Sequence, residues 1–132
     1  MHVREGRLAM YSQQGDLFDC VDWPTSKDKR FMRALESMER AVSECVLMRA
    51  DDGCELVCSV TTPFDLLEGG TAFATEMLGK RVLTDTGIAT IERIDHVGVR
   101  DVCRMHFGGI SFAAGVNADR RIYSHNTTAV KP

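Results

Sequence analysis

The stretch KRVLTDTGIATIERID, residues 80–95, places apolar residues at alternating positions on both sides of the turn sequence DTG. Such alternation is typical of half-buried β-strands, and an Asp-x-Gly sequence between two of them predicts a tight hairpin turn. The next stretch, VGVRDVCRMHF at 97–107, keeps the period of two. Two shorter candidate strands follow at 110–114 and 121–124, separated by a turn at 115–119. The second half of the chain therefore predicts a strongly bent antiparallel sheet or a small barrel.

The first half of the chain carries a helical pattern. Thr25, followed three residues later by Asp28, has the side chains of an N-terminal capping box. Apolar residues then recur at intervals of three or four, the spacing that places side chains on one face of a helix. They are Phe31, Leu35, Met38, Val42 and Cys45. The sequence thus predicts a long amphipathic helix that docks on the rest of the protein.

Between these halves, apolar runs at 46–50 and 54–60 flank the turn sequence 51–53 and predict a hairpin. Pro63 and Thr71 are suited to begin two short helices. The expected fold class is α+β, with an amphipathic helix and short helices packed on an antiparallel, barrel-like C-terminal sheet. Residues 1–24 are interpreted as a polar N-terminal leader or arm, and residues 25–132 as a single compact α+β domain.

Composition is that of an ordinary globular protein, with 132 residues, 44% of them hydrophobic and 27% charged. A net charge of −3 gives no global attraction to nucleic acid, so any such contact requires a local basic patch. Five cysteines at irregular spacings do not form a disulfide framework and indicate reduced thiols. No apolar run has the length of a membrane span, and the N-terminus has no signal-peptide pattern, so we expect a cytoplasmic protein with no membrane contact.

The sequence shows no motif for catalysis, for a cofactor or for a metal. The four histidines, at 2, 96, 106 and 125, have no zinc-ligand spacing, and no glycine-rich phosphate loop is present. Cys103 and His106 lie three residues apart on a predicted strand and so point to opposite faces. The prediction is a protein that is not an enzyme. A ligand-binding or enzymatic barrel remains an alternative, with a pocket that scattered residues such as Arg104, His106 and Tyr123 would form.

A basic face is the first candidate binding surface. Four arginines of the predicted C-terminal sheet could contact phosphate groups, because guanidinium groups match phosphate geometry. They are Arg93, Arg100, Arg104 and Arg121. Acidic residues are interleaved with them, which favours a solvated surface of ion pairs as the alternative.

The second candidate surface is QGDLF at 14–18, which resembles the linear motif that binds the bacterial DNA sliding clamp. The resemblance covers these five residues. It implies that Gln14 orients the peptide, that Asp16 takes an acidic or small position, and that Leu17 and Phe18 fill an apolar pocket of the clamp. In the alternative interpretation, Leu17 and Phe18 form an N-terminal strand or arm that docks on the protein's own core.

Residues 79–94 also resemble the opening strands of small Tudor- or KOW-like barrels of nucleic-acid-associated bacterial proteins. The expected function is a small non-catalytic accessory or inhibitor protein with a macromolecular partner, the best candidate being the sliding clamp in DNA replication. One alternative is an immunity or anti-defence protein from a mobile element that uses an acidic surface. Oligomeric state does not follow from the sequence.

Overall fold

The computed structural model describes residues 13–117 and 119–125. Within them the chain is almost entirely β-sheet, with 63% of residues in strands and 6% in helices. This part of the chain forms ten strands, one short α-helix and one short 3₁₀-helix. The elements are β1 (Leu17–Val21), α1 (Trp23–Ser26), β2 (Arg30–Ala34), β3 (Ser37–Ala50), β4 (Glu55–Ser59), β5 (Pro63–Asp65), β6 (Thr71–Phe73), η2 (Ala74–Glu76), β7 (Arg81–Thr84), β8 (Gly87–His106), β9 (Ser111–Asn117) and β10 (Arg120–Ser124).

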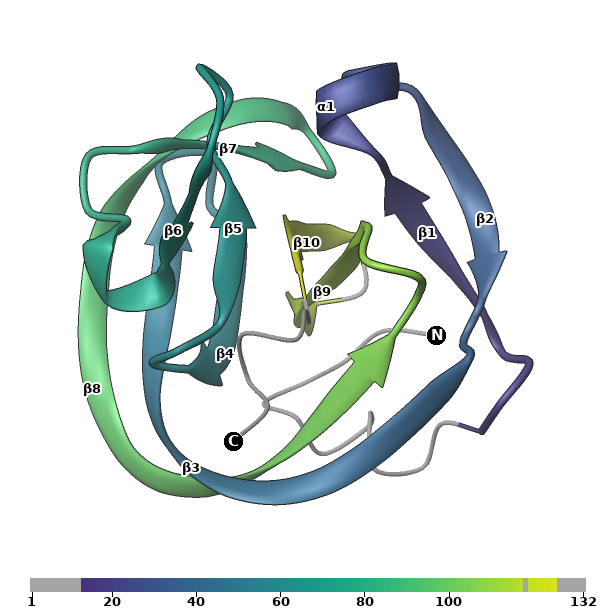
Figure 1. Cartoon of the computed structure of the whole chain (residues 1–132). Coiled ribbons are helices and arrows are strands. Elements are labelled where there is room, and N and C mark those ends of the chain that lie inside the picture. The colour runs from purple at the N-terminus through teal and green to yellow at the C-terminus, as the bar shows by residue number, and fades with distance from the viewer. Residues whose placement is uncertain (1–12, 118, 126–132) are drawn as a thin grey trace.

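Two long strands, β3 and β8, form the frame of the molecule. They pair antiparallel along the whole of β3 and curve together around the other elements (Figure 1). The pairing register shifts at two points, where Val97 and Glu92 on β8 are extra residues without a partner on β3. Such β-bulges bend a strand and increase its twist. Gly98, next to the first bulge, has a φ of 88°, a conformation that costs little only for glycine.

Eight strands share one sheet in the order β2-β1-β9-β10-β7-β8-β3-β4, and β5 and β6 form a separate two-stranded sheet. The core includes an aromatic cluster in which the Phe18 ring lies 5.2 Å from that of Phe107 and 6.3 Å from that of Phe112. These edge-on contacts are favourable beyond the area that they bury. The described part of the chain contains no helix with the length and apolar character needed to cross a bilayer.

The predicted α+β class is wrong, because the expected amphipathic helix does not form. Its residues divide between α1, β2 and β3. The chain changes direction at Leu35, whose main-chain N–H donates to the main-chain carbonyl of Asp16 at 2.8 Å. The apolar residues spaced three and four apart therefore lie on two different strands and not on successive turns of one helix. Val42, assigned to the apolar stripe, is 67% exposed. The short helices expected from Pro63 and Thr71 are β5 and β6, with only one turn of 3₁₀-helix after them.

The hairpin predictions are confirmed. β3 and β4 pair from Cys45 to Arg49 around the turn at 51–53, and β7 and β8 pair up to Thr84 and Gly87. The expected antiparallel strands of the C-terminal half are present as β7 to β10, which lie in the order β9-β10-β7-β8. Of the predicted N-terminal arm, residues 17–21 form β1, which lies between β2 and β9 in the main sheet.

Asp52 fixes the β3–β4 turn to the β7–β8 turn. Its side chain accepts hydrogen bonds from the hydroxyls of Thr84 and Thr86 and from the main-chain N–H of Cys54. Partial burial by itself raises the pKa of this carboxyl, but these three donors outweigh burial and lower the pKa below the ordinary value of 3.8.

A stability difference between wild type and Asp52→Asn is therefore expected to depend on pH. Because the folded-state pKa is lowered, the contribution of Asp52 is fully present above the ordinary pKa and disappears as the pH falls through the folded-state value. Urea unfolding at a series of pH values from neutral to acidic measures this difference. A difference that stays constant across the acidic range contradicts the assignment.

Candidate functional site

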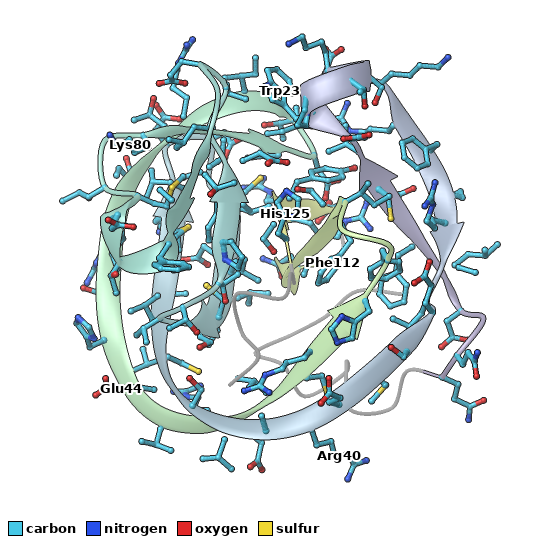
Figure 2. All side chains as sticks on the ribbon, viewed as in Figure 1. Trp23, Arg40, Glu44, Lys80, Phe112 and His125 are labelled. Atoms are coloured by element: carbon cyan, nitrogen blue, oxygen red, sulfur yellow. The ribbon has the colours of Figure 1, made fainter. Side chains whose placement is uncertain are left out.

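The candidate site lies where β5, β9 and β10 meet, in the middle of the molecule. Figure 2 shows His125 and Phe112 there, enclosed by the curve of β3 and β8. His125 directly follows β10 and is 8% exposed. Its main-chain N–H donates to the carbonyl of Pro63 at 2.9 Å, so the end of β10 is tied to β5.

The His125 side chain contacts the third residue of β5. Nε2 of the ring lies 2.7 Å from Oδ1 of Asp65, although the ring is not aligned for a regular hydrogen bond. The other carboxylate oxygen, Oδ2, accepts a hydrogen bond from the Ser111 hydroxyl at 3.0 Å. Ser111 is 2% exposed. Three polar side chains, from β5, from β9 and from the residue after β10, therefore meet in a nearly buried row, Ser111–Asp65–His125.

A hollow of about 120 Å³ adjoins this row, and His125 forms part of its wall. Three hydroxyl side chains in the wall form a hydrogen-bonded row. The hydroxyl oxygens of Ser43 and Ser59 are 2.7 Å apart, and those of Ser59 and Thr61 are 3.1 Å apart. Arg104 of β8 also reaches the wall. The hollow thus has a wall of mixed apolar and polar side chains and lies next to a buried imidazole, a group that can serve as a general acid or base.

Two cysteines in the wall of the hollow are poor nucleophiles. Burial raises the pKa of Cys58 to about 12, and it also raises the pKa of Cys103. Because the thiolate is the reactive form, both side chains stay protonated at neutral pH. All five cysteines are free thiols. The site therefore has a buried imidazole but no ready thiol nucleophile.

The residues of the clamp-like motif lie in the sheet. The segment before β1 is held to the β2–β3 corner, because Gly15 N–H donates to the Leu35 carbonyl at 2.9 Å. Asp16 accepts the main-chain N–H of Gln13 at 2.9 Å, and Gln14 lies in the turn between them. Leu17 is 58% exposed, whereas Phe18 is 2% exposed and belongs to the aromatic cluster. The strand docks on the protein's own core, as the alternative interpretation expected.

The four arginines predicted to contact phosphate are in different surroundings. Arg93 lies 2.6 Å from Asp95. Arg121 is nearly buried and binds Asp85 through both Nε and a terminal nitrogen, at 2.8 and 3.0 Å, and Asp19 at 2.7 Å. Arg100 lies opposite Ser43 on the β3–β8 ribbon, and Arg104 contributes to the hollow. A phosphate-binding role for these residues stays a prediction.

The pocket proposed as an alternative from Arg104, His106 and Tyr123 does not form. His106 lies 3.2 Å from Glu39, and the Tyr123 hydroxyl accepts a hydrogen bond from Arg30 at 3.1 Å. Asp65 and Ser111 were not predicted as site residues, and His125 was predicted only as one of four scattered histidines. The available signal in the sequence is His125-Asn126 directly after a predicted strand. Within the described residues, no cluster of three or more metal-ligating side chains is found.

The fold itself has solved counterparts: it is intein-like. A structure of an Ssp DnaB mini-intein variant, M86, has a TM-score of 0.69 and 14% sequence identity, over 86% of this chain and 79% of that chain. An intein-like domain from Clostridium thermocellum has a TM-score of 0.70 and 14% identity, over 86% and 83% of the two chains. A DnaB intein from Synechocystis sp. PCC 6803 has a TM-score of 0.69 and 14% identity, over 89% and 84%.

No protein-family model matches this sequence, and no curated protein matches it. The structural likeness overturns two predictions. The expectation of an accessory protein that binds the sliding clamp, with its immunity-protein alternative, is wrong, because the fold is that of inteins. The expectation of a non-catalytic protein is also wrong, because the proteins that share this fold are inteins, which are self-splicing domains.

Proposed function

We propose that this chain is an intein-like self-processing domain, which breaks a peptide bond of its own polypeptide just after β10. One observation carries the proposal: the last described residue, His125, is a buried imidazole in contact with a buried carboxylate, and the sequence continues with Asn126 and Thr127. The intein-like fold supports the same class of reaction. The substrate is then a part of the chain itself.

Asparagine is the residue whose side chain can cleave the bond that follows it. In this reaction the amide nitrogen of Asn126 attacks its own main-chain carbonyl carbon and forms a five-membered succinimide ring. The carbon–nitrogen bond to Thr127 breaks, and the departing nitrogen of Thr127 takes up a proton. The succinimide is later hydrolysed by water. The step needs no oxidant, cofactor or nucleophilic thiol, and this agrees with the protonated state of Cys58 and Cys103.

His125 is suited to the proton transfers of this step. An imidazole exchanges protons near neutral pH, so it can take a proton from the attacking amide and give one to the leaving nitrogen. The peptide bonds that follow His125 begin at a fixed point, because its main-chain N–H is bound to Pro63. Fixing the reacting groups next to each other removes much of the entropic barrier.

The size of the hollow favours the protein's own chain as substrate over a free small molecule. At about 120 Å³ it is smaller than the roughly 300–1,000 Å³ of most ligand pockets. A substrate that belongs to the same chain does not have to bind from solution.

The test is a fusion that carries one reporter protein before Met1 and another after Pro132. Expected products are a fragment that ends in a succinimide or a free carboxyl at Asn126 and a fragment that begins at Thr127, identified by intact mass and by sequencing of the new terminus. Asn126→Ala is expected to stop the reaction. Asn117→Ala, which changes the exposed asparagine at the end of β9, is the matched control and is expected to react as the wild type does.

A ligated product of the two reporters would show splicing, whereas two separate fragments would show cleavage on the C-terminal side. Both outcomes support self-processing, provided that the new N-terminus is Thr127. A folded wild-type fusion that stays intact overturns the proposal. So does a break at another position that persists in Asn126→Ala.

A further inference from the structure

We propose that Asp65 is a positioning residue for His125: it keeps a proton on Nε2 of the ring and leaves Nδ1 as the atom that serves the reacting bond. This inference rests on the proposed self-processing function and assigns the atom through which the histidine acts. It follows from the contacts of three side chains that come from β5, β9 and the end of β10.

The geometry fixes the histidine at two points of the same strand. Its main-chain N–H is bound to Pro63, the first residue of β5, and its ring contacts Asp65, the third residue. The side chains of His125 and Asp65 are only 9% and 11% exposed. In such surroundings water screens the contact little, so the carboxylate governs the orientation of the ring.

The separation of 2.7 Å between Nε2 and Oδ1 favours a proton between the two atoms. A carboxylate oxygen and an unprotonated ring nitrogen both present lone pairs, and they would repel each other at this distance. A proton on Nε2 removes the repulsion, and a small rotation of the ring then completes a hydrogen bond. Neither ring nitrogen has a regular hydrogen bond within the described residues, but Nε2 is the one that faces the carboxylate, so Nδ1 is the nitrogen left for chemistry.

Ser111 in turn holds the carboxylate. Its hydroxyl donates to Oδ2 of Asp65 at 3.0 Å, so each oxygen of this nearly buried group has one polar contact. The other charged or titratable groups at the hollow that His125 adjoins are Arg104 and Cys103 from β8 and Cys58 from β4. Burial keeps both thiols protonated and therefore uncharged. Asp65 is not part of the wall of the hollow, and its carboxylate contacts the ring at 2.7 Å.

The rate of fragment release from the fusion tests the role of Asp65. Asp65→Asn preserves the shape of the side chain but removes its charge, and its amide group can donate as well as accept, so Nε2 no longer has to carry the proton. We expect release to slow by about tenfold or more, in keeping with the contribution of a well-oriented acid–base group. Ser111→Ala should slow release less. Asp95→Asn, which changes the Asp95 carboxylate beside Arg93, is the matched control and should leave the rate unchanged.

A second measurement does not depend on cleavage. In the Asn126→Ala background, ¹⁵N–¹H correlation spectra of the histidine rings report which nitrogen of His125 carries the proton. We expect the proton on Nε2 with Asp65 present and a changed tautomer population in Asp65→Asn. Spectra that show a proton on Nδ1 alone, or no change on substitution, overturn the positioning role.

The two measurements separate the two ideas. If no fusion releases Thr127, the proposed function fails, while the ring spectra still decide whether Asp65 sets the tautomer. If the wild type reacts but Asp65→Asn, folded by circular dichroism, reacts at the same rate, the positioning role fails and the proposed function stands.

Discussion

Replacing His125 with alanine is expected to slow the release of Thr127 by about 10²- to 10⁴-fold, the usual contribution of a positioned general acid or base. The imidazole is the titratable group that borders both the hollow and the start of the reacting segment. Without it, the leaving nitrogen has to take its proton from water, which has little access to a residue only 8% exposed. The measurement is a time course of fragment release from the fusion by gel electrophoresis and intact mass.

The control for this variant is His96→Ala. His96 is an exposed residue of β8, pairs in register with Val46 of β3, and is not part of the wall of the hollow. It is expected to react at the wild-type rate. Because His125→Ala leaves the buried carboxylate of Asp65 without its partner, folding of both variants is checked by circular dichroism. A folded His125→Ala protein that reacts as fast as His96→Ala contradicts the assigned role.

The largest expected change in stability comes from Phe18. Truncation to alanine should lower the free energy of unfolding by about 3–5 kcal/mol, since it removes a buried ring and leaves a cavity. The ring is 2% exposed and packs edge-on against both Phe107 and Phe112. Chemical denaturation monitored by circular dichroism measures the change.

Leu17→Ala provides the matched comparison one position earlier in β1. Leu17 is 58% exposed, so this variant should stay within about 0.5 kcal/mol of the wild type. Equal effects of the two substitutions would mean that β1 does not present alternate residues to core and solvent. A large loss for Leu17→Ala with little loss for Phe18→Ala would indicate the opposite register, in which each side chain moves to the other face.

The failed helix prediction shows where local pattern is a poor guide. Phe31, Leu35 and Met38 are spaced as on one helical face, yet a corner at Leu35 separates β2 from β3. Residues 37–50 pair with residues 91–106, partners that lie far away in sequence. Such long-range pairing overrides local helical pattern, because strand stability depends on neighbours that the local sequence does not contain.

By itself the sequence determined the local features: the hairpin turns at 51–53 and at Asp85, and the alternating strands of the C-terminal half. Those depend on residues close together in the chain, whose turn chemistry and periodicity are visible in a short window. Only the tertiary structure decided the site. Asp65 and Ser111 are 46 residues apart, and His125 meets them because β10 ends beside β5. No window of sequence contains all three, since the wrapping of a sheet around its core brings them together.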